Sequence, residues 1–157
     1  MKFIITFAIF ILITCLKIDC FAEEEWELVT GINETSLDHI AIDVSSNNII
    51  YAASKKTIYK AQNSDNAWVI VFSVETEDSP INFITVHEKD IFVCAKNGLF
   101  KSSDMGLNWK KVFKGVGEKE NNVSYMAFSR DRRIYLATDA GLFISEDNGT
   151  NWVKDNT

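Results

Sequence analysis

Short runs of apolar, β-branched and aromatic residues alternate with polar segments along most of the chain. In its middle part, four such runs follow one another: Ile81–Val86, Ile91–Ala95, Leu99–Ser102 and Trp109–Phe113. The segments between them are rich in Gly, Asn, Asp, Ser and Lys, as turns are. None of the runs is long enough for a helix with apolar residues every three or four positions. The pattern therefore predicts an antiparallel sheet of four short strands.

The same unit recurs along the chain. All four tryptophans are evenly spaced, with separations of 42, 41 and 43 residues: Trp26, Trp68, Trp109 and Trp152. The stretches before the last three align as IIYAASKKTIYKAQNSDNAW, IFVCAKNGLFKSSDMGLNW and IYLATDAGLFISEDNGTNW. Four strands in about 42 residues is the size of one β-propeller blade. We therefore expect an all-β propeller with three four-stranded blades, at about 38–73, 81–113 and 123–154, and an orphan outer strand at Glu25–Val29.

Apolar residues occupy matching positions in the aligned repeats. Three sets of equivalent positions are Tyr51, Phe92 and Tyr135; Ala53, Cys94 and Ala137; and Ile58, Leu99 and Leu142. Upstream of them, each repeat carries an apolar triplet, at 40–42, 84–86 and 126–128. These matches extend the alignment of the three repeats beyond their tryptophans.

Two turns carry the same eight-residue motif, S-x-D-x-G-x-x-W. Its residues are Ser102, Asp104, Gly106 and Trp109 in one copy and Ser145, Asp147, Gly149 and Trp152 in the other. The first blade has only a degenerate form, with Ala61, Asn63 and Asp65 at the Ser, Asp and Gly positions. The motif resembles the Asp-box, or bacterial neuraminidase repeat, of Asp-box β-propellers. A short carboxylate accepts backbone N–H groups of a tight hairpin, and glycine supplies a positive φ, so we interpret these residues as structural braces.

The resemblance spans sialidases, xyloglucan-cleaving hydrolases, sorting receptors of the sortilin type and photosystem II assembly factors. Sialidases of this type grip a carboxylate with three arginines from separate blades. Here Arg130, Arg132 and Arg133 all stand in one turn, which argues against a sialidase. The residue pattern of the repeats, GLF followed by S, D, G and W, most resembles that of the photosystem assembly factors and of the non-catalytic relatives of xyloglucan hydrolases.

The first 22 residues are typical of a secretory signal peptide. An apolar run from Phe3 to Leu16 follows Lys2, and small residues precede Glu23. Such a run is too short to cross a hydrocarbon core about 30 Å thick. An uncleaved membrane anchor is the alternative, although Lys17 and Asp19 interrupt the span. We therefore expect residues 23–157 to be secreted, extracellular or periplasmic, with no stable membrane span after cleavage.

The charge and the composition argue against several classes of partner and of reactive site. The net charge of −6 argues against a nucleic-acid partner, because phosphates require a basic face. Cys94 is the one cysteine beyond the leader, and we interpret it as a small buried side chain rather than a reactive thiol or an intermolecular bridge. His39 and His87 are isolated and are interpreted as turn or strand-end residues. The sequence therefore predicts no catalytic, cofactor-binding or metal-ligating residues.

Loops at one end of the blades are expected to form the ligand-binding face. They are the loops that enter the innermost strands and the turns between second and third strands: Thr30–Asp38, Val74–Pro80, Lys114–Asn122, Lys55-Lys56, Lys96-Asn97 and Asp139-Ala140. Loops of this kind carry function on rigid scaffolds. The alternative for the long, acidic and polar loops is that they are only solvated connections. We predict a non-enzymatic binding or assembly module that takes a protein or glycan ligand there. A glycoside hydrolase-like fragment and an oligomeric lectin are the alternatives.

Three blades leave a ring incomplete, because propellers close with typically four to eight blades. The two outer flanks would then stay open. We expect a shortened propeller, and the alternative is association into a homo-oligomer, for example two copies that form a six-bladed ring.

Overall fold

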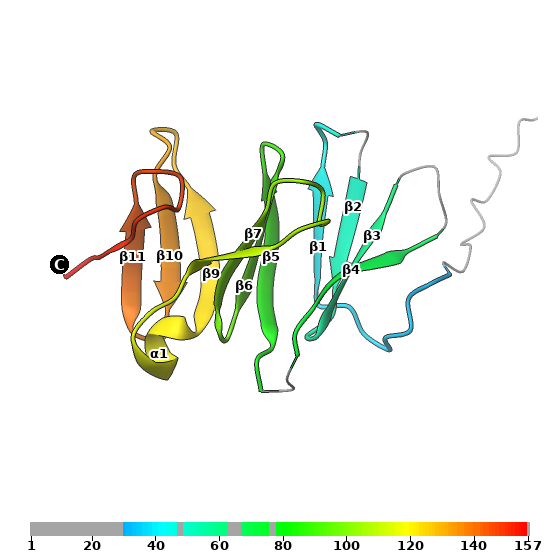
Figure 1. Ribbon diagram of the computed structural model, residues 1–157, viewed down its shortest axis with the longest axis horizontal. Coiled ribbons are helices and arrows are strands. Elements are labelled where there is room, and N and C mark those ends of the chain that lie inside the picture. Colours follow the sequence, from blue (N-terminus) through cyan, green and yellow to red (C-terminus); the bar gives the residue numbers. More distant parts are fainter. Residues whose placement is uncertain (1–29, 47–48, 63–66, 76–77, 157) are drawn as a thin grey trace, which may run out of the picture.

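The computed structural model describes residues 30–46, 49–62, 67–75 and 78–156. Within these ranges the chain forms twelve strands in three separate sheets and one short helix (Figure 1). The predicted leader at 1–22, the predicted orphan strand Glu25–Val29 and Trp26 lie outside the described residues.

Each sheet has four antiparallel strands that follow one another in sequence order. The first sheet consists of β1 (His39–Asp43), β2 (Ile49–Ala53), β3 (Thr57–Ala61) and β4 (Val69–Ser73). The second consists of β5 (Ile81–His87), β6 (Asp90–Ala95), β7 (Gly98–Ser102) and β8 (Lys110–Phe113). The third consists of β9 (Val123–Phe128), β10 (Ile134–Thr138), β11 (Gly141–Ser145) and β12 (Val153–Lys154). We call the three sheets blades 1, 2 and 3.

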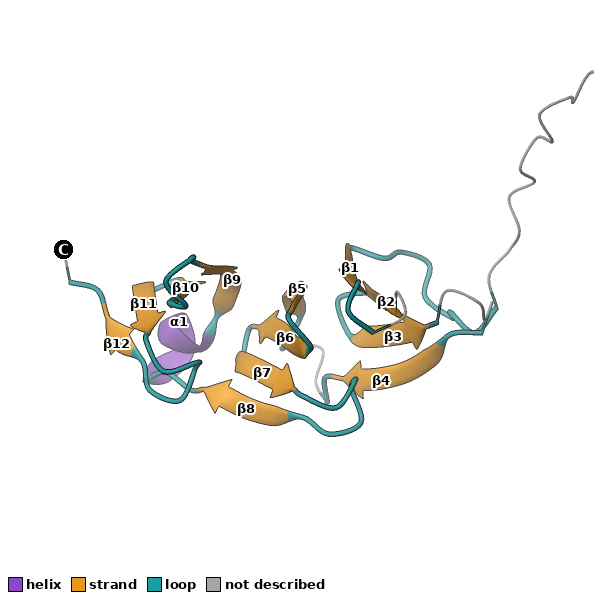
Figure 2. Ribbon diagram, turned by 90° about the horizontal axis from the view of Figure 1, so that it is seen from above, coloured by secondary structure: helices purple, strands orange, loops and turns teal. Residues whose placement is uncertain are grey.

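The blades stand side by side in a curved row. Viewed from above, β1, β5 and β9 lie along the inner side of this row and β4, β8 and β12 along its outer edge (Figure 2). This is the radial arrangement of propeller blades around an axis. The predicted all-β propeller fold, incomplete with three four-stranded blades, is confirmed.

The pleat gives each blade two faces, because successive side chains of a strand point to opposite sides. We call the face toward the following blade the downstream face and the other the upstream face. On blade 2, the downstream face presents Phe92, Cys94 and Leu99 to blade 3, and the upstream face presents Ile84 and Val93 to blade 1.

The hydrophobic core is divided between the two blade interfaces. Between blades 1 and 2, buried residues include Tyr51, Ala53 and Ile58 of blade 1. Between blades 2 and 3, Phe92, Cys94 and Leu99 pack against a set from blade 3: Val123, Met126, Ile134, Leu136 and Phe143. Each fully buried Leu or Phe side chain stabilises the fold by about 1.5–3 kcal/mol, so facing blades supply most of each other's stability.

Cys94 lies inside the second of these cores. Its side chain is completely buried, and burial raises the pKa of the thiol far above its ordinary value. A thiol with a raised pKa is a poor nucleophile, because the reactive form is the thiolate. The structure thus agrees with a packing role for Cys94.

One element differs from the expectation of an irregular loop. Residues between blades 2 and 3 form the short helix α1 (Gly117–Asn121), which lies below β9 and β10 in Figure 1. The Asn121 side chain accepts a hydrogen bond from the Gly115 N–H at 3.0 Å and donates one to the Gly117 carbonyl at 2.7 Å. These hydrogen bonds hold the short helix locally. Its sequence therefore lacks the apolar periodicity from which a helix is predicted.

Candidate functional site

The first complete octet, Ser102–Trp109, forms the hairpin between β7 and β8. The Ser102 hydroxyl is buried, donates to Asp104 Oδ1 at 2.8 Å and accepts the Gly106 N–H at 2.9 Å. Asp104 also accepts the backbone N–H of Asn108 at 2.8 Å and its side-chain amide at 2.7 Å. Four contacts thus fix the turn around one carboxylate and one hydroxyl.

The second octet, Ser145–Trp152, repeats this arrangement between β11 and β12. Ser145 donates to Asp147 at 2.9 Å and accepts the Gly149 N–H at 2.8 Å. Asn151 donates its backbone N–H to Asp147 at 2.7 Å and its side-chain amide at 2.6 Å. The residue before each glycine, Met105 or Asn148, also has a positive φ of 58°. The two octets therefore share one backbone path as well as one sequence pattern.

Each octet tryptophan links its own blade to the preceding one. The indole N–H of Trp109 donates to the Gly106 carbonyl of its own turn at 3.1 Å and to the Val71 carbonyl of β4 at 2.8 Å. The indole N–H of Trp152 likewise donates to Gly149 and, across the interface, to Val112 of β8, each at 3.1 Å. The octets thus act between blades as well as within a hairpin, which the sequence pattern did not indicate.

The two octet aspartates do not share a site. Asp104 lines a pocket of about 670 Å³ between the octets, together with Lys101, Lys110 and Asn148. Asp147 lines other pockets, toward Glu88 on one side and Asp155 on the other. Each carboxylate is engaged by donors of its own turn. Half of the degenerate first octet, positions 63–66, lies outside the described residues.

The pKa of Asp104 gives the octet a pH dependence that can be measured. The Asn108 side-chain amide, its backbone N–H and the Ser102 hydroxyl lower this pKa from 3.8 to about 2. A lowered pKa means that the stabilisation is present above pH 3.8 and is lost as the pH falls through about 2. We expect the free energy of unfolding to fall more steeply in this window for the wild type than for Asp104→Asn. Urea titrations at a series of pH values test this, and parallel pH curves for the two proteins would contradict it.

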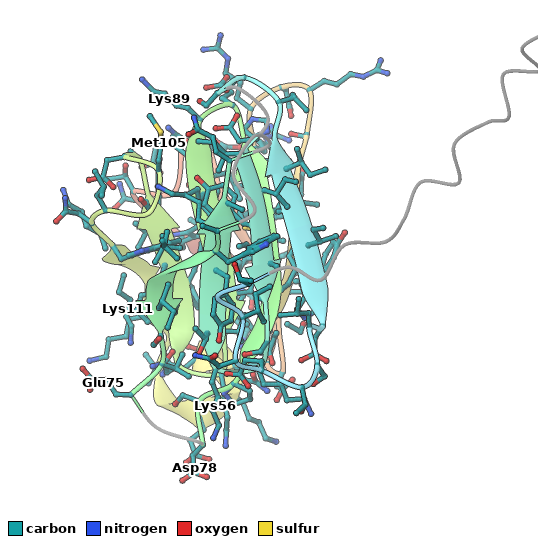
Figure 3. The ribbon with its side chains drawn as sticks, turned by 90° about the vertical axis from the view of Figure 1, so that its right-hand side faces the viewer. Lys56, Glu75, Asp78, Lys89, Met105 and Lys111 are labelled. Carbon is teal, nitrogen blue, oxygen red and sulfur yellow. The ribbon has the colours of Figure 1, made fainter. Side chains whose placement is uncertain are left out.

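The loops expected to form a ligand face do lie together at one end of the blades. Ile81 donates its N–H to the Lys55 carbonyl at 2.8 Å, and Lys96 donates to Pro80 at 3.0 Å. Asp139 similarly donates its N–H to the Asn122 carbonyl at 3.3 Å. In Figure 3, Lys56, Glu75 and Asp78 gather at this end, whereas Lys89 and Met105 lie at the opposite end. We call the end with Lys56, Glu75 and Asp78 the loop face.

An aromatic row crosses the inner strands next to the loop face. His39, Phe83 and Tyr125 stand at or near the starts of β1, β5 and β9. The His39 and Phe83 rings meet edge to face with centroids 6.1 Å apart, and the Phe83 and Tyr125 centroids are 4.3 Å apart. Tyr125 is 53% exposed. Each blade thus contributes one ring to a continuous surface.

Sequence reasoning missed this row. The three residues directly precede the aligned triplets at 40–42, 84–86 and 126–128, so they are equivalent positions of the repeat. An alignment extended by one residue would have placed three rings in register. The interpretation of His39 as an isolated strand-end residue was therefore incomplete, because the strand end brings it to Phe83.

Charged and polar groups form a pocket on the same loop face. It has a volume of about 460 Å³ and is lined by Asp78, Ser79, Lys96, Asn97, Lys111, Lys114, Gly117, Glu118 and Asn121. Among its charged residues, Lys96 and Lys114 lie in loops, Lys111 in β8, Glu118 in α1 and Asp78 in the connection between blades 1 and 2. Beside it, the Asn82 side chain donates to the Val123 carbonyl at 2.7 Å and so holds the two inner strands together.

The arginines lie elsewhere. The turn between β9 and β10, which carries Arg130, Arg132 and Arg133, is at the end opposite the loop face. Arg133 pairs there with Glu146 at 3.0 Å and with Asp131 at 3.5 Å. His87 is at the same end and stacks on Phe128 with ring centroids 3.9 Å apart. Arg133 and His87 thus make local contacts at that end.

Two further observations concern only the described part of the chain. No group of three or more His, Cys, Asp or Glu side chains is arranged there to hold a metal ion. No helix in that part is long and apolar enough to span a bilayer.

The family is decided by a match that spans all of the described residues. Residues 30–157 match the model of the DUF6242 beta propeller domain. The chain belongs to this family. No curated protein matches the sequence. The family model describes a beta propeller domain, in agreement with the three blades of the structure.

Solved structures support the same fold. An ancestral GH74 enzyme superposes on this DUF6242 domain with a TM-score of 0.64 at 19% identity, over 83% of this chain and 20% of that one. YCF48 from Cyanidioschyzon merolae gives 0.58 at 19% identity, over 81% and 42% of the two chains. YCF48 bound to D1 peptide gives 0.51 at 19% identity, over 74% and 39%. The chain thus spans between a fifth and about two fifths of these structures, and the likeness concerns the fold.

Proposed function

We propose that this propeller domain is a non-enzymatic binding module whose ligand lies on the loop face, across the row of His39, Phe83 and Tyr125. The observation that carries the proposal is the row itself. Three rings from three blades form one surface at the ends of the inner strands, and the Tyr125 ring is half exposed. Aromatic side chains supply large contact area at a small cost in conformational entropy, and they dominate binding energies at interfaces.

The neighbouring pocket gives the site its polar part. The pocket is lined by Lys96, Lys111 and Lys114 together with Asp78 and Glu118. One surface therefore offers positive and negative side chains. A segment of a partner protein fits this combination, because its apolar side chains can lie on the rings while its polar groups reach the pocket. The structure of YCF48 with D1 peptide is a case of a propeller of the same fold with a bound peptide. We therefore favour a protein segment over a glycan as the ligand.

The carboxyl groups support binding rather than glycoside hydrolysis. A glycosidase needs a carboxylic acid with a raised pKa beside a second carboxylate. Where the carboxyls of the described residues have shifted pKa values, the shifts are downward: Asp43, Asp104, Glu120, Asp131 and Asp147. Near the loop face, Glu120 accepts the Val116 N–H at 2.7 Å and pairs with Lys154 at 3.1 Å, and these contacts lower its pKa. Such a group is a poor general acid.

Two finer assignments belong to the same proposal. The shared hydrogen bonds of the octets support the view that Ser102–Trp109 and Ser145–Trp152 are Asp-boxes with a bracing role. The pattern of the first 22 residues supports export of the protein.

A binding experiment with paired variants tests the site. Peptides selected on the immobilised protein from a displayed random library, and a glycan array, serve as probes. We expect Tyr125→Ala to weaken binding of the selected peptides at least tenfold, as for an interface hot spot. His87→Ala, which removes a ring at the opposite end of the blades, should leave binding unchanged. Equal losses for both variants, or glycan hydrolysis that depends on a loop-face acid, would overturn the proposal.

A further inference from the structure

Two cavities meet beside the turn between β6 and β7. The first is the charged pocket of about 460 Å³ on the loop face. The second has a volume of about 380 Å³ and lies where blades 1 and 2 meet, with Phe72 of β4, Phe100 of β7 and Trp109 among its lining residues. Asn97 and Lys111 line both cavities. The two cavities are therefore adjacent, and we call them together the outer groove.

The Lys111 side chain stands at the junction of the two cavities. Its Cδ and Cε lie 3.5 Å from the place that a Cβ on Gly98 would take, and its ammonium lies 5.0 Å from the centroid of the Phe100 ring. Glycine at position 98 thus leaves room for the lysine stem, and the aromatic ring attracts the ammonium. Figure 3 shows Lys111 on the same side of the molecule as Glu75 and nearer the middle of the blades.

The Lys111 ammonium is available to an anion. Among the described residues, Lys111 forms no ion pair, and neither do Lys96 and Lys114 of the first cavity. The carboxylates of Asp78 and Glu118 line this cavity and Glu75 lines the second, but none of them pairs with these lysines. Lys111 differs from the other charged groups, because Gly98 and Phe100 hold it beside the aromatic cavity. It is therefore the group to which a ligand carboxylate is best matched.

The Asn97 side chain offers the junction a group for the main chain of a ligand. Its Oδ1 is buried and has no hydrogen-bond partner among the described residues. Buried polar atoms are nearly always paired, so an unpaired one indicates a partner that is absent. No hydrogen bond to a described residue fixes the orientation of this amide. Rotation about its terminal torsion therefore turns it toward an N–H group of a bound segment at little cost.

The second cavity suits one large apolar side chain. Phe72 is central to its wall, with ring centroids 5.3 Å from Phe100 and 4.9 Å from Trp109. All three rings are only partly buried, so their edges remain open to a ligand. An apolar side chain that enters a pocket of this kind is the usual anchor of a protein interface.

We infer that the outer groove binds an extended segment of a partner protein in which an Asp or Glu side chain stands close to a large apolar one. The carboxylate pairs with Lys111, the apolar side chain enters the second cavity, and a main-chain N–H bonds to Asn97. The inference rests on the proposed function, because the same segment continues through the first cavity toward the aromatic row. Lys111 lies between two cavities, so the segment runs past it and its carboxylate belongs to a side chain rather than to a chain end.

Peptide selection with lysine variants tests this pairing. Peptides selected on the wild-type protein from a displayed random library, and synthesised with amidated C-termini, should share an acidic residue within a few positions of a large apolar one. Lys111→Met keeps the apolar stem and removes the charge, and it should weaken their binding about tenfold. Lys110→Met is the matched control, since this neighbouring lysine of β8 lines neither cavity of the groove.

A double-mutant cycle identifies the two partners directly. Replacement of the acidic residue of the peptide with Gln should weaken binding to the wild type about tenfold and leave binding to Lys111→Met unchanged, because that variant has already lost the pair. Ser73→Trp fills the second cavity from an exposed position. It should remove the preference for the apolar residue of the peptide over alanine. Circular dichroism confirms that each variant is folded.

The outcomes separate this inference from the proposed function. Weaker binding to Tyr125→Ala with unchanged binding to Lys111→Met overturns the inference and leaves the proposed function intact. Unchanged binding to both variants, or a selection that yields no peptide, overturns both. Equal losses for Lys111→Met and Lys110→Met, or binding that requires a free C-terminal carboxylate, overturn the inference alone.

Discussion

Replacement of Trp109 with alanine is expected to lower the free energy of unfolding by about 3–5 kcal/mol, as for other large aromatic residues in a core. The partly buried ring packs against Phe72 of blade 1 with centroids 4.9 Å apart, and against the core between blades 1 and 2. Its indole N–H reaches the Val71 carbonyl. The alanine variant therefore loses both the packing and the link between two blades. Urea unfolding followed by circular dichroism measures the change.

Trp109→Phe separates these two contributions. Phenylalanine keeps an aromatic ring in the core but has no N–H to donate, so the cross-blade hydrogen bond is lost with less loss of packing. A net hydrogen bond contributes about 0.5–1.5 kcal/mol, and we expect the Phe variant to be destabilised by clearly less than the Ala variant. An alanine effect near zero would mean that the tryptophan does not join the blades in solution.

Gly106→Ala is expected to destabilise the protein by about 2–5 kcal/mol, for two independent reasons. Gly106 has a φ of +87°, a conformation that costs other residues about 1–2 kcal/mol. A Cβ at this position would also lie 2.9 Å from Val71 Cβ on blade 1, and overpacking of this kind costs about 1–3 kcal/mol. The substitution forces the octet away from the preceding blade.

Gly117→Ala provides the control for this substitution. Gly117 has a similar φ of +80°, but a Cβ there would meet no other atom within 4 Å. Its substitution should therefore show the backbone strain alone. The difference between the two unfolding free energies, measured under the same conditions, reports the close approach of the blades. Equal effects for the two variants would contradict the role of Gly106 at the interface.

Spacing and alternation were sufficient to predict the blades, because each strand has one periodic apolar pattern and each repeat buries it in the same way. The evenly spaced tryptophans give the length of the repeat independently of the strand pattern. Helix α1 was missed because it is held by polar contacts such as those of Asn121, which leave no apolar periodicity. The cross-blade bond of Trp109 was missed because its acceptor is a main-chain carbonyl, and every residue has one.

The candidate binding site was harder to predict than the fold. His39, Phe83 and Tyr125 are different residue types, and none belongs to a recognised motif. They come together only because the propeller places equivalent strand starts side by side. A repeat alignment that compares physical class, here an aromatic ring, rather than residue identity would have found them. The loop lysines gave no signal, since charged side chains in loops are ordinarily solvated.

The tryptophan links bear on how the chain unfolds. In a repeat protein, the free energy of unfolding is the sum of contributions from single repeats and from the contacts between neighbouring repeats. Here the apolar cores and the cross-blade hydrogen bonds of the indole N–H groups all belong to the contacts between blades. A single four-stranded sheet retains little that holds it together once its neighbour has left. Native-state hydrogen exchange should therefore show protection released in pairs of facing sheets, and the cooperative unit of this molecule is the interface rather than the blade.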